Sequence, residues 1–107
     1  MNKSAKPLIL IVDDNRDQLT LTERFLSGSG YAVITADSGR AALGALGEVK
    51  PDLILLDVMM PEMDGYEVCS KLQQDSATAY IPVIFITALG EEQDKARAFS
   101  VGAVDIW

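Results

Sequence analysis

The chain has 107 residues, 49% of them hydrophobic and 23% charged, and it carries a formal net charge of −7 with no histidine. Length and composition predict one globular domain over residues 1–107, with no apolar run long enough for membrane insertion. The acidic balance argues against direct binding of nucleic acid, and the lack of histidine excludes hydrolases with an imidazole base and histidine-ligated zinc.

The first predicted strand, Leu8–Val12, is a continuous apolar run of the kind found in buried parallel sheets, and it ends at Asp13 and Asp14. A helix is expected next, with Asn15 as its N-cap and Gln18 three residues later in a capping-box pattern. The residues expected on its core-facing side are Leu19, Leu21, Phe25 and Leu26.

The middle of the chain repeats this alternation. A short strand is predicted over Tyr31–Thr35, followed by a helix that Ser38 caps. A second continuous apolar run, Leu53–Leu56, predicts a buried strand that ends at Asp57. Asp64 is the expected N-cap of the helix that follows.

The last part of the chain begins with a predicted strand over Val83–Ile86, which ends at Thr87. The next helix is expected to turn Ala96 and Phe99 toward the core, and a fifth strand is predicted within Ala103–Trp107. Such alternation predicts a doubly wound α/β fold, in which right-handed crossovers place helices on both faces of a parallel sheet.

Cys69 is the single cysteine, so no internal disulfide can form, and its place on an apolar helix face predicts a buried thiol. The first residues do not have the pattern of a signal peptide. Both observations predict a cytoplasmic protein.

Acidic or hydroxyl side chains follow three of the predicted strands. Because the carboxyl ends of parallel strands meet at one edge of a sheet, Asp13, Asp14 and Asp57 are expected to lie together. Thr87 is expected beside them. Three close carboxylates repel one another unless a cation compensates, and oxygen ligands favour Mg²⁺, with Mn²⁺ as the alternative. The sequence therefore predicts a magnesium site suited to phosphoryl transfer.

Four segments of the chain carry a specific pattern: Ile9–Asn15, Pro51–Pro61, Met63–Gly65 and Ile81–Ala88. In order and spacing they resemble the response-regulator receiver domain of two-component signal transduction, and the similarity covers essentially the whole chain. The resemblance implies a flavodoxin-like sheet with strand order 2-1-3-4-5.

The resemblance also implies roles for the acidic residues. Asp57 matches the phosphoacceptor, an aspartate that forms an acyl phosphate. Asp13 and Asp14 match the acidic pair that holds Mg²⁺ together with the acceptor. The backbone carbonyl of Met59 matches the remaining protein ligand of the metal.

The resemblance further implies a conformational switch. Thr87 matches the hydroxyl that hydrogen-bonds the new phosphoryl group, and Ala88 matches the small residue whose backbone contacts it. A histidine kinase or phosphotransfer protein is the implied phosphodonor. The chain would be a signalling domain that assists its own phosphorylation and dephosphorylation, rather than an enzyme.

The family pattern continues past the fifth strand with a Lys-Pro pair and a fifth helix, whereas this sequence ends at Trp107. We therefore expect a C-terminally incomplete receiver domain, with the fifth strand truncated and the fifth helix absent. A homodimer or a swapped partner copy that covers the bare face of the sheet is the other expectation.

Two further functions remain open from the sequence. A receiver-like scaffold that binds partners without being phosphorylated is one, because the family lysine is missing. A metal-dependent phosphohydrolase is the other, although Asp57-Val58-Met59 lacks the second acid of an Asp-x-Asp phosphatase loop. A stable phosphate on the protein distinguishes the receiver from both.

Overall fold

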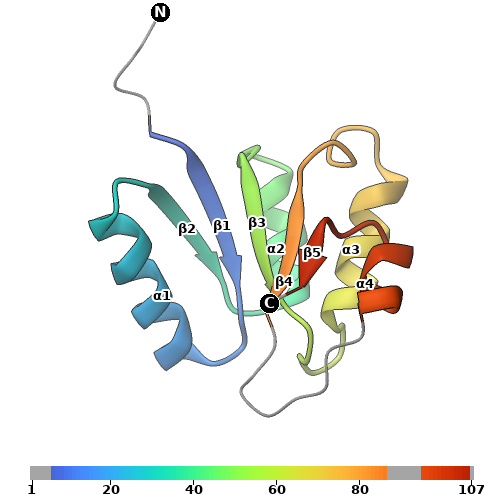
Figure 1. The fold of residues 1–107 in the computed structure, drawn as a ribbon, viewed down its shortest axis with the longest axis horizontal. Helices are drawn as coiled ribbons and strands as arrows, with labels where there is room; N and C mark the ends of the chain where they lie inside the picture. The colour runs from blue at the N-terminus through green and yellow to red at the C-terminus, as the bar shows by residue number, and fades with distance from the viewer. Residues whose placement is uncertain (1–5, 87–94, 107) are drawn as a thin grey trace, which may run out of the picture.

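The computed structural model describes residues 6–86 and 95–106. Strands and helices alternate along these residues, as predicted (Figure 1). The elements are β1 (Leu8–Val12), α1 (Arg16–Gly28), β2 (Ala32–Ala36), α2 (Gly39–Leu46), β3 (Leu53–Asp57), α3 (Gly65–Gln74), β4 (Val83–Ile86), α4 (Lys95–Ser100) and β5 (Asp105–Ile106). None of the helices in the described ranges has the length and apolar character needed to cross a membrane.

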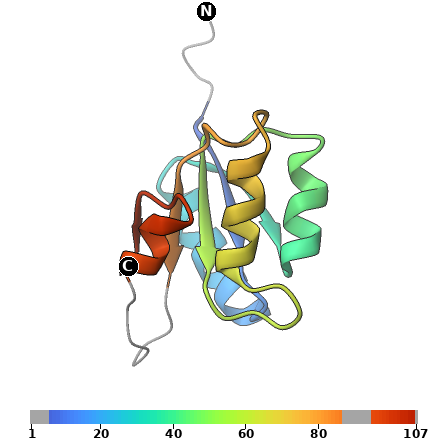
Figure 2. The same ribbon diagram turned by 90° about the vertical axis from the view of Figure 1, so that its right-hand side faces the viewer.

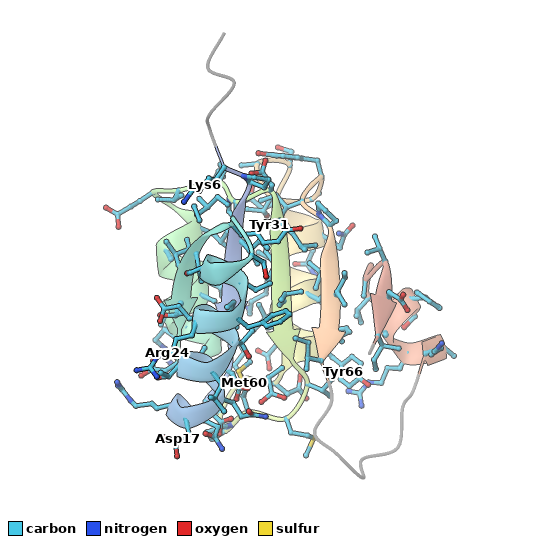
Figure 3. The ribbon with its side chains drawn as sticks, turned by 60° about the vertical axis from the view of Figure 1, so that its left-hand side comes forward. Lys6, Asp17, Arg24, Tyr31, Met60 and Tyr66 are labelled. Carbon is cyan, nitrogen blue, oxygen red and sulfur yellow. The ribbon has the colours of Figure 1, made fainter. Side chains whose placement is uncertain are left out.

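The strands form one sheet in the order β2-β1-β3-β4-β5, and each neighbouring pair is parallel. Their carboxyl ends therefore lie at one edge of the sheet, where the arrowheads point in Figure 1. Figure 3 shows Asp17 and Met60 near this edge and Lys6 at the opposite one. The predicted doubly wound topology is confirmed.

Helices cover both faces of the sheet, and α2 and α3 lie side by side on one of them (Figure 2). This face holds the larger core, in which side chains from the strands meet those of α2, α3 and α4. The smaller cluster on the other face joins Leu19 of α1 to Ile9, Ile11 and Leu55. Apolar residues at alternate strand positions supply both clusters, because successive strand side chains point to opposite faces.

Each of the first three helices begins at the predicted cap. The side chains of Asn15, Ser38 and Asp64 accept hydrogen bonds from backbone N–H groups three residues later, at 3.1, 3.0 and 2.9 Å. Each bond satisfies an N–H group that has no partner within its helix. These caps fix where the chain turns from the carboxyl edge of the sheet into a helix.

The predicted core face of α1 is partly wrong. Leu19 is buried and Leu26 is half-buried, but Leu21 and Phe25 are 62% and 73% exposed. Successive helix residues are rotated by about 100°, so Leu21 lies on the side of the helix opposite Leu19. Since α1 contacts only one face of the sheet, a narrow stripe is enough to cover it.

The predicted inner face of α4 is also wrong. Ala98 is fully buried, whereas Ala96 is exposed and Phe99 is 49% exposed. The helix ends at Ser100, two residues before Gly102, which has φ +102°, and the Ala103 N–H donates to the Ala98 carbonyl at 3.1 Å.

The fifth strand is shorter than the predicted region, because only Asp105 and Ile106 pair with β4. Trp107 lies outside the described residues.

Candidate metal centre

Three carboxylates gather at the carboxyl edge of the sheet. Asp13 and Asp14 follow β1, and Asp57 is the last residue of the neighbouring strand β3. One carboxylate oxygen from each residue lies within 4.8 Å of the other two. Oxygen atoms at such spacing match the donor chemistry that Mg²⁺ and Mn²⁺ require.

The acidic pair is held in place by the turn between β1 and α1. The Asp13 N–H donates to the Ala36 carbonyl at 3.1 Å, which extends the pairing of β1 with β2 by one step. The Asp13 Oδ1 accepts a hydrogen bond from the Asn15 N–H at 2.9 Å. Because Asn15 also caps α1, one short segment both starts the helix and orients the carboxylate.

Asp57 is half-buried, and its surroundings disfavour its charged form. Burial and, to a smaller extent, the negative charges of Asp13 and Asp14 together raise the pKa of the Asp57 carboxyl from its ordinary value of 3.8 to about 7. The Met59 N–H donates to the carboxyl and opposes this shift in pKa. A divalent cation would relieve the repulsion, so the three residues fit the predicted ion.

Gly65 touches the backbone of Asp57. Its N–H donates to the Val58 carbonyl at 2.9 Å, and a Cβ on Gly65 would overlap the Asp57 carbonyl oxygen. In the sequence, Gly65 stands out only as part of the Met63–Gly65 motif, which does not predict this contact. The Asp-Gly pair was a local signal for a helix start, but it did not indicate which backbone the glycine would approach.

A second missed feature is an ion pair beside the acidic cluster. The Arg16 guanidinium lies 2.8 Å from the Asp37 carboxylate, so it joins the first turn of α1 to the segment after β2. An arginine at the start of a helix is unfavourable for the helix dipole, and Asp37 compensates for it. The only sequence signal was that both residues follow the ends of strands that proved to be neighbours.

The other predicted site residues divide into two groups. The Met59 side chain is 63% exposed beside Asp57, and the proposed role of its carbonyl as a metal ligand stays a prediction. Thr87 and Ala88 lie outside the described residues, so their predicted roles are not tested. Ile86, the residue before Thr87, pairs with Asp57 in the sheet.

Comparison with known proteins identifies the family. The sequence model of the response regulator receiver domain matches residues 9–106. The alkaline phosphatase synthesis transcriptional regulatory protein PhoP of Bacillus subtilis is 46% identical over 105 residues, which cover 98% of this chain and 41% of that protein. Response regulator PleD of Caulobacter vibrioides is 46% identical over 97 residues, which cover 91% of this chain and 21% of that protein. The chain thus spans about two-fifths or less of the length of these relatives.

Solved structures agree with the sequence comparison. The N-terminal domain of a response regulator receiver protein from Methanoculleus marisnigri JR1 has a TM-score of 0.85 and 38% identity, covering 94% of this chain and 81% of that one. Chemotaxis protein CheY4 of Vibrio cholerae has a TM-score of 0.89 and 30% identity, covering 96% of this chain and 86% of that one. The chain therefore belongs to the response regulator receiver domain family of two-component signal transduction.

Proposed function

We propose that the chain accepts a phosphoryl group on Asp57 in a Mg²⁺-dependent reaction and acts as a conformational switch. The observation that supports this most directly is the gathering of Asp13, Asp14 and Asp57 oxygens within 4.8 Å at the carboxyl edge of the sheet. A half-buried acceptor with a raised pKa fits a group that reacts only beside a cation.

The chemistry is a single displacement at phosphorus. An ionised Asp57 oxygen attacks the phosphorus atom of the donor, and a new O–P bond forms. The bond from phosphorus to the leaving group breaks, and its electron pair departs with that group. Asp13, Asp14, Asp57 and the Met59 carbonyl would hold the ion, which supplies positive charge to the phosphoryl oxygens when bound.

The switch would involve the end of β4. Thr87 would donate a hydrogen bond to the phosphoryl group, and the backbone of Ala88 would contact it. The register that pairs Ile86 with Asp57 supports this assignment, because it brings the last described residue of β4 beside the acceptor. New charge-assisted hydrogen bonds can then shift an equilibrium between two arrangements of the chain.

The proposed partner is a histidine kinase or a phosphotransfer protein in the cytoplasm, with a phosphohistidine as donor. The chain would assist its own phosphorylation and dephosphorylation without turning over a free substrate.

Leu53, Ile84 and Ile86 are only half-buried on the α1 side of the sheet. A second copy of the chain could cover them, and sedimentation at several protein concentrations would reveal such a homodimer.

Intact mass after incubation with acetyl phosphate and Mg²⁺ tests the proposal. We expect one phosphoryl adduct on the wild-type chain, none on Asp57→Asn, and an unchanged adduct on Asp17→Asn, which alters an exposed acid of α1. A chelator should prevent the reaction.

Other outcomes of the same experiment would contradict the proposal. A wild-type chain that gains no adduct but binds a partner would be a scaffold. Release of phosphate from a phosphomonoester without any adduct would indicate a phosphohydrolase.

A further inference from the structure

Three side chains from different elements stack at the contact between α3 and α4. The guanidinium carbon of Arg97 lies 4.0 Å from the centre of the Tyr66 ring. That ring packs on Phe85 of β4, with 5.1 Å between the ring centres and 60° between the ring planes. The order of contact is therefore Arg97 on α4, Tyr66 on α3 and Phe85 on β4, which we call the Arg97 stack.

The Arg97 stack continues to the acceptor. Phe85 is paired with Leu56, the residue before Asp57. Gly65, the residue before Tyr66, lies between the Asp57 backbone and the Phe85 ring, because a Cβ on Gly65 would meet both. A displacement of the Asp57 backbone would therefore press on Gly65 and on the Phe85 ring, which packs against Tyr66.

The inner and outer parts of the Arg97 stack differ in exposure. Phe85 is fully buried and Tyr66 is buried, whereas Arg97 is exposed. The C-terminal end of α4 is held separately, by the fully buried Ala98 and by the Cys69 thiol, which donates to the Val101 carbonyl at 3.2 Å. Arg97 can therefore be replaced without opening the core.

We propose that Arg97 is a positioning residue that holds α4 against α3 and so sets the equilibrium between two arrangements of α4. The inference rests on the proposed function, since a phosphoryl group on Asp57 can act as a switch only by favouring one of two arrangements, and the inference assigns it to the arrangement in which α4 has moved away from α3. An arrangement in which α4 moves away from α3 loses the contact with Tyr66. Removal of Arg97 consequently favours that arrangement.

The size and sign of the effect follow from linkage. Loss of a cation–π contact made by an exposed arginine shifts such an equilibrium by about two- to fivefold. Coupling between sites is reciprocal, so the same factor appears as tighter binding of a phosphoryl mimic at Asp57. A residue that only supports the fold would change the unfolding temperature without changing this affinity.

Titration of the chain with beryllofluoride in the presence of Mg²⁺ tests the inference, with amide hydrogen exchange of α4 as a second measurement. Arg97→Met should bind beryllofluoride about two- to fivefold more tightly than wild type and should exchange faster in α4. Arg97→Lys, which keeps a cation, should lie between the two. Lys95→Met removes another exposed cation of the same helix and should match wild type.

A double-mutant cycle assigns the effect to the ring. Arg97→Met should change the affinity much less in a Tyr66→Leu background, whereas Tyr66→Phe, which keeps the ring, should leave the effect intact. Unchanged or weaker binding by Arg97→Met would overturn the inference while leaving the proposed function in place. A wild-type chain that binds no beryllofluoride would defeat both.

Discussion

Gly65 positions Asp57 by having no side chain. Its backbone approaches Asp57 so closely that a methyl group has no room, whereas a methyl group on Gly44, in the middle of α2, would meet nothing within 4 Å. The two glycines therefore make a matched pair, one in a close backbone contact and one in open space.

Gly65→Ala should lower the free energy of unfolding by about 1–3 kcal/mol, because the new methyl group forces the backbone at Asp57 to shift. It should also slow formation of the phosphoryl adduct. Gly44→Ala should instead be neutral or stabilise the chain by up to about 1 kcal/mol, since alanine is the better helix former. Chemical denaturation of both variants gives the comparison, and equal effects would contradict this account of Gly65.

Asp57 should also limit stability. Its pKa in the folded chain, about 7, lies above the ordinary value of 3.8. The carboxyl therefore contributes most to stability below about pH 4, and this contribution is lost as the pH rises through about 7. In metal-free buffer, Asp57→Asn should raise the free energy of unfolding by about 1 kcal/mol at pH 8, a value that allows for solvent screening of a half-buried group.

The difference between wild type and Asp57→Asn should shrink steadily on acidification and vanish near pH 4. Urea denaturation at pH 4, 6 and 8 measures it. Parallel stability profiles for the two chains would show that the acidic neighbours and burial do not penalise the charged carboxylate.

Among the elements, α1 has apolar side chains in two different environments. Leu19 packs on the sheet, whereas Phe25 is mostly exposed. Leu19→Ala should cost about 2–5 kcal/mol, because it removes buried surface and leaves a cavity, while Phe25→Ala should change stability by less than about 0.5 kcal/mol. Thermal unfolding of the two variants checks this. A large loss for Phe25→Ala would mean that the Phe25 side chain is buried and not exposed.

Local patterns explain which elements could be predicted from the sequence. The capping residues Asn15, Ser38 and Asp64 act within four residues of chain, so their signal is complete in the sequence. Continuous apolar runs likewise predicted buried parallel strands, and thereby the edge where Asp13 and Asp57 meet.

Helix faces were predicted less well, for a physical reason. The side of α1 or α4 that is buried depends on the layer against which the helix packs, and Phe25 and Phe99 are hydrophobic whichever way they point. The Arg97 stack was missed because Arg97, Tyr66 and Phe85 come from three elements and form no local pattern. Contacts of this kind require the tertiary arrangement to be known.

At the scale of the whole molecule, the acidic cluster exists only when β1 and β3 are paired, since its residues come from both strands. An ion that binds the folded chain but not the unfolded one stabilises by about 2.7 kcal/mol at a hundred times its dissociation constant. We therefore expect the unfolding temperature to rise with Mg²⁺ concentration and to return to its metal-free value when a chelator is added.

Asp13→Asn and Asp14→Asn should weaken the dependence of the unfolding temperature on Mg²⁺, whereas Asp17→Asn, outside the cluster, should preserve it. An unfolding temperature that does not respond to Mg²⁺ in the wild-type chain would contradict the metal assignment.

The parallel order of the sheet has a kinetic consequence. Each strand pairing joins segments separated by a helix, and β1 must associate with β3 after β2 and α2 have been synthesised between them. Non-local pairing of this type is slow compared with the formation of a turn or a helix. A refolding or newly made chain should thus acquire affinity for magnesium late, when its central strands pair. The rate at which it begins to bind the ion would therefore measure the rate at which the sheet assembles.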